Sequence, residues 1–153
     1  MMAFLNGFAS QFRNLIFVIP EHEDISLYFS EQGDIQQQIR IHGCNRVVHV
    51  KKALELMKTP AGRGKAVIEV RDDFFPKNTD RYLIEWENGE KMVIAGRKEE
   101  ADLICSVHHL SQLITGYRSI TQLQTAGCVE VRCEPGLLDS LFPRKALYIL
   151  DMF

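Results

Sequence analysis

Several motifs that mark common enzyme classes are missing from this 153-residue sequence. None of its four cysteines forms a CxxC pair, and none of its five histidines lies in HxxxH or near a carboxylate at zinc-ligand spacing. We therefore expect no metal site, and we expect reduced core thiols rather than disulfides. The sequence also has no G-x-S-x-G, so it gives no sign of an α/β-hydrolase nucleophile.

Long apolar runs and an excess of one charge are also absent. No stretch reaches the roughly 18 apolar residues of a membrane-spanning helix, and the N-terminus lacks the charged region and cleavage site of a signal peptide. Lys and Arg total 18 against 20 Asp and Glu, and they are interspersed, as in "RKEEAD" at 97–102. Without a basic stripe we expect no nucleic-acid partner. We likewise expect no membrane partner and a cytoplasmic location.

A phosphate-binding loop is not indicated either. "PAGRGKA" at 60–66 is the one glycine-rich stretch with basic residues, but Lys65 is not followed by Ser or Thr and a strand comes next. A turn is the better interpretation. His108 and His109 begin a predicted helix, where solvated first-turn histidines are more usual than a catalytic base. Catalysis is not visible in this chain taken alone.

The composition, with 46% hydrophobic and 25% charged residues, is that of a globular protein with one domain, or one domain and a short extra element. Residues 1–44 read as α-β-α-β: a helix from Phe4 to Leu15, a strand at 15–20, a helix at 24–31 capped by Asp24, and a strand at 35–41. This element is too small to be stable alone, so we expect it to dock on something.

The remainder, residues 45–153, alternates strand and helix patterns. Strands are predicted at 66–72, 81–87, 91–95, 101–107 and 128–134. Asn88-Gly89 between the second and third predicts a type I′ hairpin. Helices are predicted at 50–57, at 108–116, between Ser119 and Gly127, and from Pro135.

These patterns predict an α+β fold: a four- to five-stranded, largely antiparallel sheet covered by helices, preceded by the small α-β-α-β element. The residues expected to face its core are Ala66, Ile68 and Val70, then Tyr82, Ile84 and Trp86, then Leu137, Leu138, Leu141 and Phe142.

The loop "VRDDFFPKN" at 70–78 carries the first candidate site residue. Asp72 can accept backbone N–H groups, Pro76 stiffens the turn, and Asn78 can adopt a left-handed conformation or bond its own backbone. A structural role for this loop is the favoured interpretation. The alternative is an acidic loop in which Asp72 lies near a substrate.

The ending "KALYILDMF" is apolar to its last residue, although chain ends usually fray unless something holds them. A buried anchor of this kind would fix the α-carboxylate of Phe153 in space. Asp151, within the same ending, is a second residue expected near a substrate.

Three stretches resemble one family: V-R-D-D-F-F-P-K-N at 70–78, A-D-L-I-C-S-V-H-H-L-S-Q-L-I-T-G-Y-R-S at 101–119 with L-Q-T-A-G at 123–127, and the closing D-M-F. They look like the C-terminal part of Eis-type (enhanced intracellular survival) GNAT acetyltransferases. In that family two GNAT-like domains precede a domain resembling sterol carrier proteins. The resemblance implies that 1–44 is a remnant of the second GNAT-like domain and that 45–153 is the sterol-carrier-protein-like domain.

The resemblance also implies an activity, the transfer of acetyl from acetyl-CoA to an amine such as an aminoglycoside or lysine. The carboxylate of Phe153 would enter the active site as general base or orient the amine. The family's acetyl-CoA site and its general-acid tyrosine lie in the first GNAT domain. The tyrosines here do not match that acid: Tyr28, Tyr82, Tyr117 and Tyr148.

The chain is therefore expected to bind no acetyl-CoA alone and to need a GNAT domain in the same or a neighbouring polypeptide. Two positions depart from the family: His49 stands where an acidic residue is frequent, and Ala146 near a frequent proline. Both put the particular substrate in doubt.

Two other functions stay open. A stand-alone sterol-carrier-type module would bind an apolar ligand in a cavity of a few hundred cubic ångströms. A structural or oligomerisation module would use its apolar N-terminal residues, Phe4, Phe8, Phe12 and Phe17, as a contact patch. Self-association, as a homo-oligomer, is the expectation from that patch.

Overall fold

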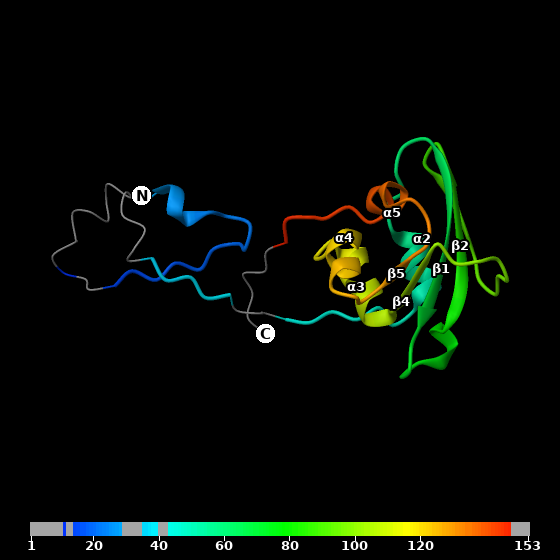
Figure 1. The fold of residues 1–153 in the computed structure, drawn as a ribbon, viewed down its shortest axis with the longest axis horizontal. Helices are drawn as coiled ribbons and strands as arrows, with labels where there is room; N and C mark the ends of the chain where they lie inside the picture. Colours follow the sequence, from blue (N-terminus) through cyan, green and yellow to red (C-terminus); the bar gives the residue numbers. More distant parts are fainter. Residues whose placement is uncertain (1–10, 12–13, 29–34, 40–42, 148–153) are drawn as a thin grey trace. The chain divides into compact units, whose positions relative to one another are not determined.

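The computed structural model describes residues 11, 14–28, 35–39 and 43–147 (Figure 1). The chain separates into two compact units, Met1–Arg40 and Ile41–Phe153. No helix among the described residues is long and apolar enough to cross a membrane.

The described part of the first unit contains the 3-10 helix η1, Ile25–Tyr28. Asp24 begins it as predicted, because its Oδ1 accepts a hydrogen bond of 3.0 Å from the backbone N–H of Ser26. The strands predicted at 15–20 and 35–41 are not formed by their described residues, 15–20 and 35–39. Two short strands without a larger sheet are marginal, which accounts for this error. Most of the helix predicted from Phe4 to Leu15 lies outside the described residues.

The second unit is built on a five-stranded sheet, and this confirms the predicted α+β fold. Its strands are β1 (Arg63–Arg71), β2 (Asp80–Glu87), β3 (Glu90–Ile94), β4 (Leu103–Ser106) and β5 (Glu130–Val131). They lie in the order β3-β2-β1-β4-β5. Three of the four pairings are antiparallel, but β4 runs parallel to β1. β5 is shorter than predicted, since it pairs with only two residues of β4.

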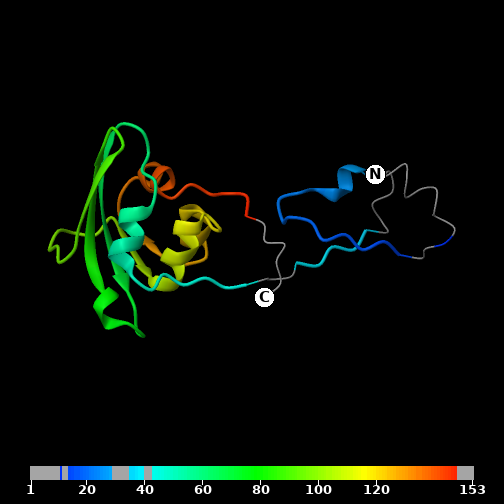
Figure 2. The same cartoon turned by 180° about the vertical axis from the view of Figure 1, so that it is seen from behind.

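The helices lie on one side of the sheet, and the β3–β4 connection lies on the other (Figures 1 and 2). They are α2 (Val50–Leu56), α3 (Val107–Thr115), α4 (Ile120–Thr125) and α5 (Pro135–Leu141). The 3-10 helix η2 (Pro76–Asn78) lies in the connection between β1 and β2. The predicted local signals are confirmed. Asn88 and Gly89 have φ of 50° and 94°, as a type I′ turn requires, and Ser119 and Gln122 form the capping box.

The main core lies between the sheet and the helices. It contains both predicted strand faces, Ala66, Ile68 and Val70 with Tyr82, Ile84 and Trp86, and the helical residues Leu138, Leu141 and Phe142, with Leu137 packed against it. Cys105 is a core thiol as predicted, but Cys44 is exposed. No disulfide joins cysteines in the part of the chain that the structure describes.

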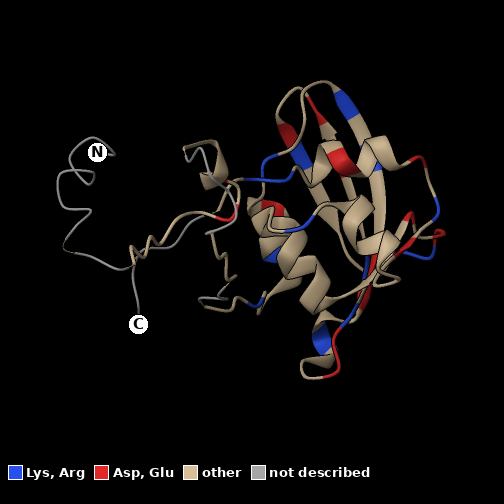
Figure 3. Cartoon of the chain, turned by 60° about the vertical axis from the view of Figure 1, so that its left-hand side comes forward, with Lys and Arg blue, Asp and Glu red and all other residues tan. Residues whose placement is uncertain are grey.

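The outer face of the sheet carries a smaller cluster and a row of charges. Val67, Leu83, Ala101 and Ile104 form the cluster, with Ile94 packed against it. Beside it Glu69 pairs with Arg71 and Arg81, both at 2.8 Å. Figure 3 shows both signs of charge interspersed over this unit, as the sequence indicated.

Gly64 lies within β1 rather than in the turn predicted at 60–66. A Cβ on Gly64 would lie 2.3 Å from the Trp86 ring, whereas one on Gly136 in α5 would meet nothing within 4 Å.

We expect Gly64→Ala to lower the free energy of unfolding by about 1–3 kcal/mol, because the core would be overpacked. The control Gly136→Ala should raise it by about 0.5–1 kcal/mol through helix propensity. Urea unfolding of both variants measures this, and equal values would contradict it.

Candidate functional site

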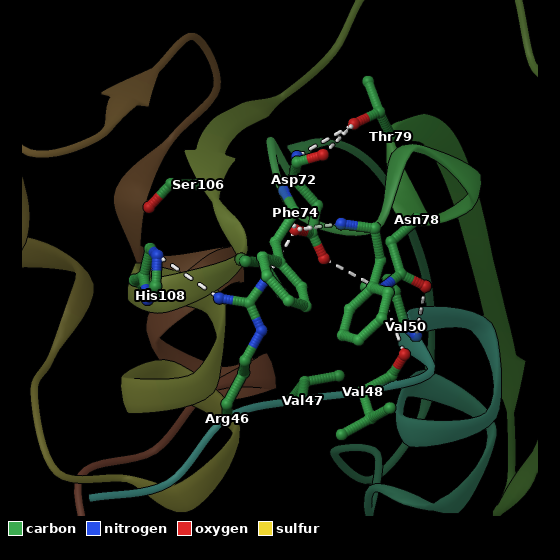
Figure 4. Close-up of polar contacts among 12 residues, drawn as sticks. Arg46, Val47, Val48, Val50, Asp72, Phe74, Asn78, Thr79, Ser106 and His108 are labelled. Atoms are coloured by element: carbon green, nitrogen blue, oxygen red, sulfur yellow. Dashed lines mark hydrogen bonds and ion pairs between the residues drawn. The ribbon is translucent and has the colours of Figure 1, made fainter.

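Of the predicted site residues, the structure describes Asp72. Asp151 and Phe153 lie outside the described residues, so their places near a substrate stay predictions. Asp72 is the centre of a polar network between β1, η2, α3 and the segment before α2 (Figure 4). We call this network the Asp72 cluster: Arg46, Asp72, Phe74, Phe75, Asn78, Thr79 and His108.

The Asp72 carboxylate lies immediately after β1 and is buried, with 2% of the residue exposed. As predicted, it accepts backbone N–H groups: Oδ1 receives hydrogen bonds from Phe74 at 3.0 Å and Phe75 at 2.9 Å. Oδ1 also accepts from Arg46 Nη2 at 2.5 Å, and Oδ2 accepts from Asn78 Nδ2 at 2.9 Å. The carboxylate therefore closes the loop on itself and joins it to the segment before α2.

Asn78 makes long-range contacts where the sequence suggested a bond to its own backbone. Its Nδ2 donates to the carbonyl of Val48 at 3.1 Å, and its Oδ1 accepts from the N–H of Val50 at 3.3 Å. Val50 is the first residue of α2, whose free N–H groups need acceptors. Asn78 has no left-handed backbone. It holds the start of α2 against the loop, and the Oγ1 of Thr79 accepts the N–H of Asp72 at 2.8 Å.

Arg46 covers the outer side of the cluster. Its guanidinium carbon lies 5.6 Å from the ring centroids of both Phe74 and Phe75, within the range of cation–π attraction. Its Nη1 lies 3.4 Å from His108 Nε2, so a hydrogen bond there places the His108 proton on Nδ1. Arg46 thus ties the segment before α2 to the Asp72 loop and to the first turn of α3.

The surroundings keep Asp72 ionised. Burial by itself would raise its pKa, but hydrogen bonds from Asn78, Phe75 and Phe74, together with the charge of Arg46, lower the pKa to about 2. A carboxylate with so low a pKa and every oxygen engaged is a poor general base. The geometry supports the structural role favoured from the sequence. Proximity of the loop to a substrate stays a prediction.

The lowered pKa makes stability dependent on pH. The unfolded carboxyl has a pKa near 3.9, so the contribution of Asp72 is fully present above that value. It is lost as pH falls from about 4 towards the folded-state pKa of about 2. We expect the urea midpoint of the wild type to fall between pH 6 and pH 3 more than that of Asp72→Asn. Parallel pH profiles would contradict this.

Other titratable groups in the core are not poised for reaction. Burial raises the pKa of the Tyr82 hydroxyl to about 12, and its O–H donates to the Asn78 carbonyl at 3.0 Å. Burial likewise raises the pKa of the Cys105 thiol to about 12. His109 lies 3.0 Å from the Ser106 hydroxyl through Nδ1, within the N-terminal cap of α3. No group of three or more His, Cys, Asp or Glu in the described ranges could hold a metal.

Two hollows in the described part of the chain are shallow and open to solvent. One, of about 560 Å³, lies at the hairpin end of β1–β3 and is lined mainly by charged residues with Trp86 and Met92. The other, of about 550 Å³, lies over α4 beside Arg118. Neither is an enclosed apolar chamber.

Sequence reasoning missed Arg46 and His108 as members of the cluster. They lie 26 residues before and 36 residues after Asp72, and neither has a local motif. The sequence offered one signal, which is that Asp72 ends a predicted strand. An Asp buried at such a position needs a charged partner.

Comparison with solved structures places this fold among parts of larger proteins. A GCN5-related N-acetyltransferase from Anabaena variabilis matches with a TM-score of 0.63 and 26% identity, over 71% of this chain and 28% of that one. One from Kribbella flavida matches with a TM-score of 0.61 and 22% identity, over 71% and 29%. Eis1 from Mycobacterium abscessus matches with a TM-score of 0.56 and 24% identity, over 68% and 26%. This chain spans less than a third of each.

A sequence search of curated proteins found no match. The profile of one family, described as "Sterol carrier protein domain", matches residues 50–150, which include every strand of the sheet and α2–α5. The chain therefore belongs to the sterol carrier protein domain family.

Proposed function

We propose that this chain is the C-terminal portion of an Eis-like GNAT N-acetyltransferase and is inactive alone. The supporting observation is the combination of a sterol carrier protein domain with likeness to a GCN5-related N-acetyltransferase, of which the chain covers 28%. The complete enzyme would move acetyl from acetyl-CoA to an amine such as an aminoglycoside or a lysine side chain. Residues 1–44 would be the remnant of the second GNAT-like domain, and 45–153 the C-terminal domain.

The glycine-rich stretch at 60–66 does not have the form of a phosphate-binding loop. It runs into β1, which begins at Arg63, so no helix N-terminus follows it to receive phosphate groups. Acetyl-CoA, the acetyl donor, would be held by the GNAT domain. We assign no step at the cofactor to this chain.

The contribution of this chain would be the carboxylate of Phe153. An amine attacks a thioester only after losing its proton, and a positioned carboxylate can take that proton from the ammonium group or orient the free amine. In the complete enzyme the new bond would join the amine nitrogen to the acetyl carbon, and the thioester C–S bond would break. The leaving thiolate would be protonated by the general acid that the resemblance assigns to the first GNAT domain.

The required partner would be a GNAT domain in the same or a neighbouring polypeptide, in the cytoplasm. The test is an acetyl-transfer assay with three samples: this chain, a GNAT polypeptide from the same source, and their mixture. We expect transfer only in the mixture. Full activity of the GNAT polypeptide alone would overturn the proposal.

We also propose self-association. Several large apolar side chains of the second unit are exposed, including Phe74 at 74% and Val48 at 58%, and both lie on segments that meet at the Asp72 cluster. Sedimentation velocity at high concentration should show a species larger than a monomer. A clean monomer would remove this part of the proposal.

A second candidate function, binding of an apolar ligand, is favoured by the family description. It needs an apolar chamber, and the space between sheet and helices is filled by large side chains such as Trp86, Phe142 and Ile84. A lipid-exchange assay decides it, because transfer above background would establish this function.

A further inference from the structure

The end of α3 is joined to the outgoing part of the chain. Gly116 ends the helix in a left-handed conformation with φ of 81°, and its N–H bonds back to the carbonyls of Gln112 and Leu113. The Gly116 carbonyl points the other way and accepts the N–H of Lys145 at 2.8 Å. This bond joins the helix cap to the segment that follows α5.

Glycine is also needed at position 116 because the backbone of the outgoing segment lies close to it. A Cβ on Gly116 would lie 2.8 Å from the Pro143 carbonyl oxygen and 2.9 Å from the Lys145 nitrogen. Both are backbone atoms, which cannot turn aside as a side chain can. The outgoing segment is therefore seated directly on the α3 cap.

The other half of α3 holds the incoming part of the chain. Ser111 is buried, and its Oγ accepts the N–H of Val47 at 2.9 Å while donating to the carbonyl of Val107 at 2.7 Å. Ser111 and Gly116 are five residues apart, or about 7.5 Å along a helix axis. Both connections of the domain lie on the helical side of the sheet (Figures 1 and 2). One short helix thus fixes where the chain enters and where it leaves.

We propose that the α3 cap at Gly116 anchors the outgoing segment and makes Gly116 a positioning residue for the carboxylate of Phe153. This inference rests on the proposed function. Phe153 lies eight positions after Lys145, and eight residue steps reach at most about 28 Å when extended. An anchor at Lys145 limits the volume that the carboxylate can reach, which raises its effective concentration at the active site of the proposed GNAT partner.

The test compares Gly116→Ala with Gly127→Ala. Gly127 follows α4 with φ of 69°, and a Cβ there would meet nothing within 4 Å. Both variants carry the strain of a left-handed alanine, but only the first pushes on Pro143 and Lys145. In this chain alone, Gly116→Ala should speed amide hydrogen exchange at Lys145 and tryptic cleavage after Arg144 at least tenfold. Gly127→Ala should leave both rates near the wild type.

The activity arm uses the mixture with the GNAT polypeptide. Gly116→Ala should lower kcat about tenfold or more with the KM for acetyl-CoA unchanged, since misplacement of a catalytic group weakens chemistry rather than cofactor binding. If Gly116 acted on stability alone, its replacement would not lower kcat with an unchanged KM at temperatures below the melting temperature. Equal kcat for Gly116→Ala and Gly127→Ala would overturn the positioning role.

A second pair of variants keeps the test decisive if Gly116→Ala does not fold. Lys145→Pro removes the N–H that bonds to Gly116, and Lys145→Ala keeps it. We expect the kcat loss only with proline, and equal activity of the two would overturn the proposal. If the wild-type mixture is inactive, the proposed function fails and the positioning role fails with it. The rates of amide hydrogen exchange at Lys145 and of tryptic cleavage after Arg144, measured on this chain alone, still decide whether the α3 cap anchors the outgoing segment.

Discussion

Appending one glycine after Phe153 should abolish most acetyl transfer by the mixture of this chain and the proposed GNAT partner. The added residue moves the terminal carboxylate by up to about 3.5 Å, and loss of a positioned general base typically costs 10²–10⁴-fold in rate. We expect kcat to fall by about that factor. The KM for acetyl-CoA should not change, because the cofactor is assigned to the other domain. Steady-state kinetics with a fixed amine measures both constants.

The matched control is Phe153→Leu, which keeps an apolar last residue and leaves the carboxylate at the same position in the chain. It should retain kcat within a few-fold. A C-terminal amide, which removes the charge at constant length, should behave like the added glycine. Unchanged kcat in the extended or the amidated chain would refute the role of the carboxylate.

Replacing Asp72 with asparagine should give the largest loss of stability of any single change in the loop. The NH2 of the asparagine would take the place of one carboxylate oxygen, where it would face either the Asn78 amide or the N–H groups of Phe74 and Phe75, and Arg46 would lose its counter-charge. Broken buried networks of this kind cost roughly 3 kcal/mol or more. In a domain of this size that corresponds to a fall of about 10 °C in Tm.

Asp73→Asn is the control for this change, because Asp73 is the next residue and is exposed. It should alter stability by less than about 0.5 kcal/mol. Thermal unfolding followed by circular dichroism at pH 7 compares the two variants. A loss of less than about 1 kcal/mol for Asp72→Asn would contradict the arrangement of the Asp72 cluster.

Features that depend on neighbouring residues were predictable from the sequence. The Asn88-Gly89 hairpin, the Ser119–Gln122 capping box and the glycine end of α3 need only a few residues each. The same holds for the acceptance of Phe74 and Phe75 N–H groups by Asp72. Each is set by local backbone geometry and so leaves a local signature.

Features that depend on distant residues were not predictable. The parallel pairing of β1 with β4, the Arg46–Asp72 ion pair and the seating of Lys145 on Gly116 join segments 26 or more residues apart. They follow from how the elements pack and not from any short pattern. The strands expected at 15–20 and 35–41 failed for a related reason. Apolar spacing predicts a strand, but a strand also needs a sheet to pair with.

We propose that this chain completes an acetyltransferase site without holding the cofactor. Isothermal titration of acetyl-CoA into the isolated chain, then into its mixture with the GNAT polypeptide, tests this proposal. We expect no heat of binding with the chain alone and saturable binding in the mixture. Binding of acetyl-CoA by the isolated chain, or no heat of binding in either titration, would contradict this proposal.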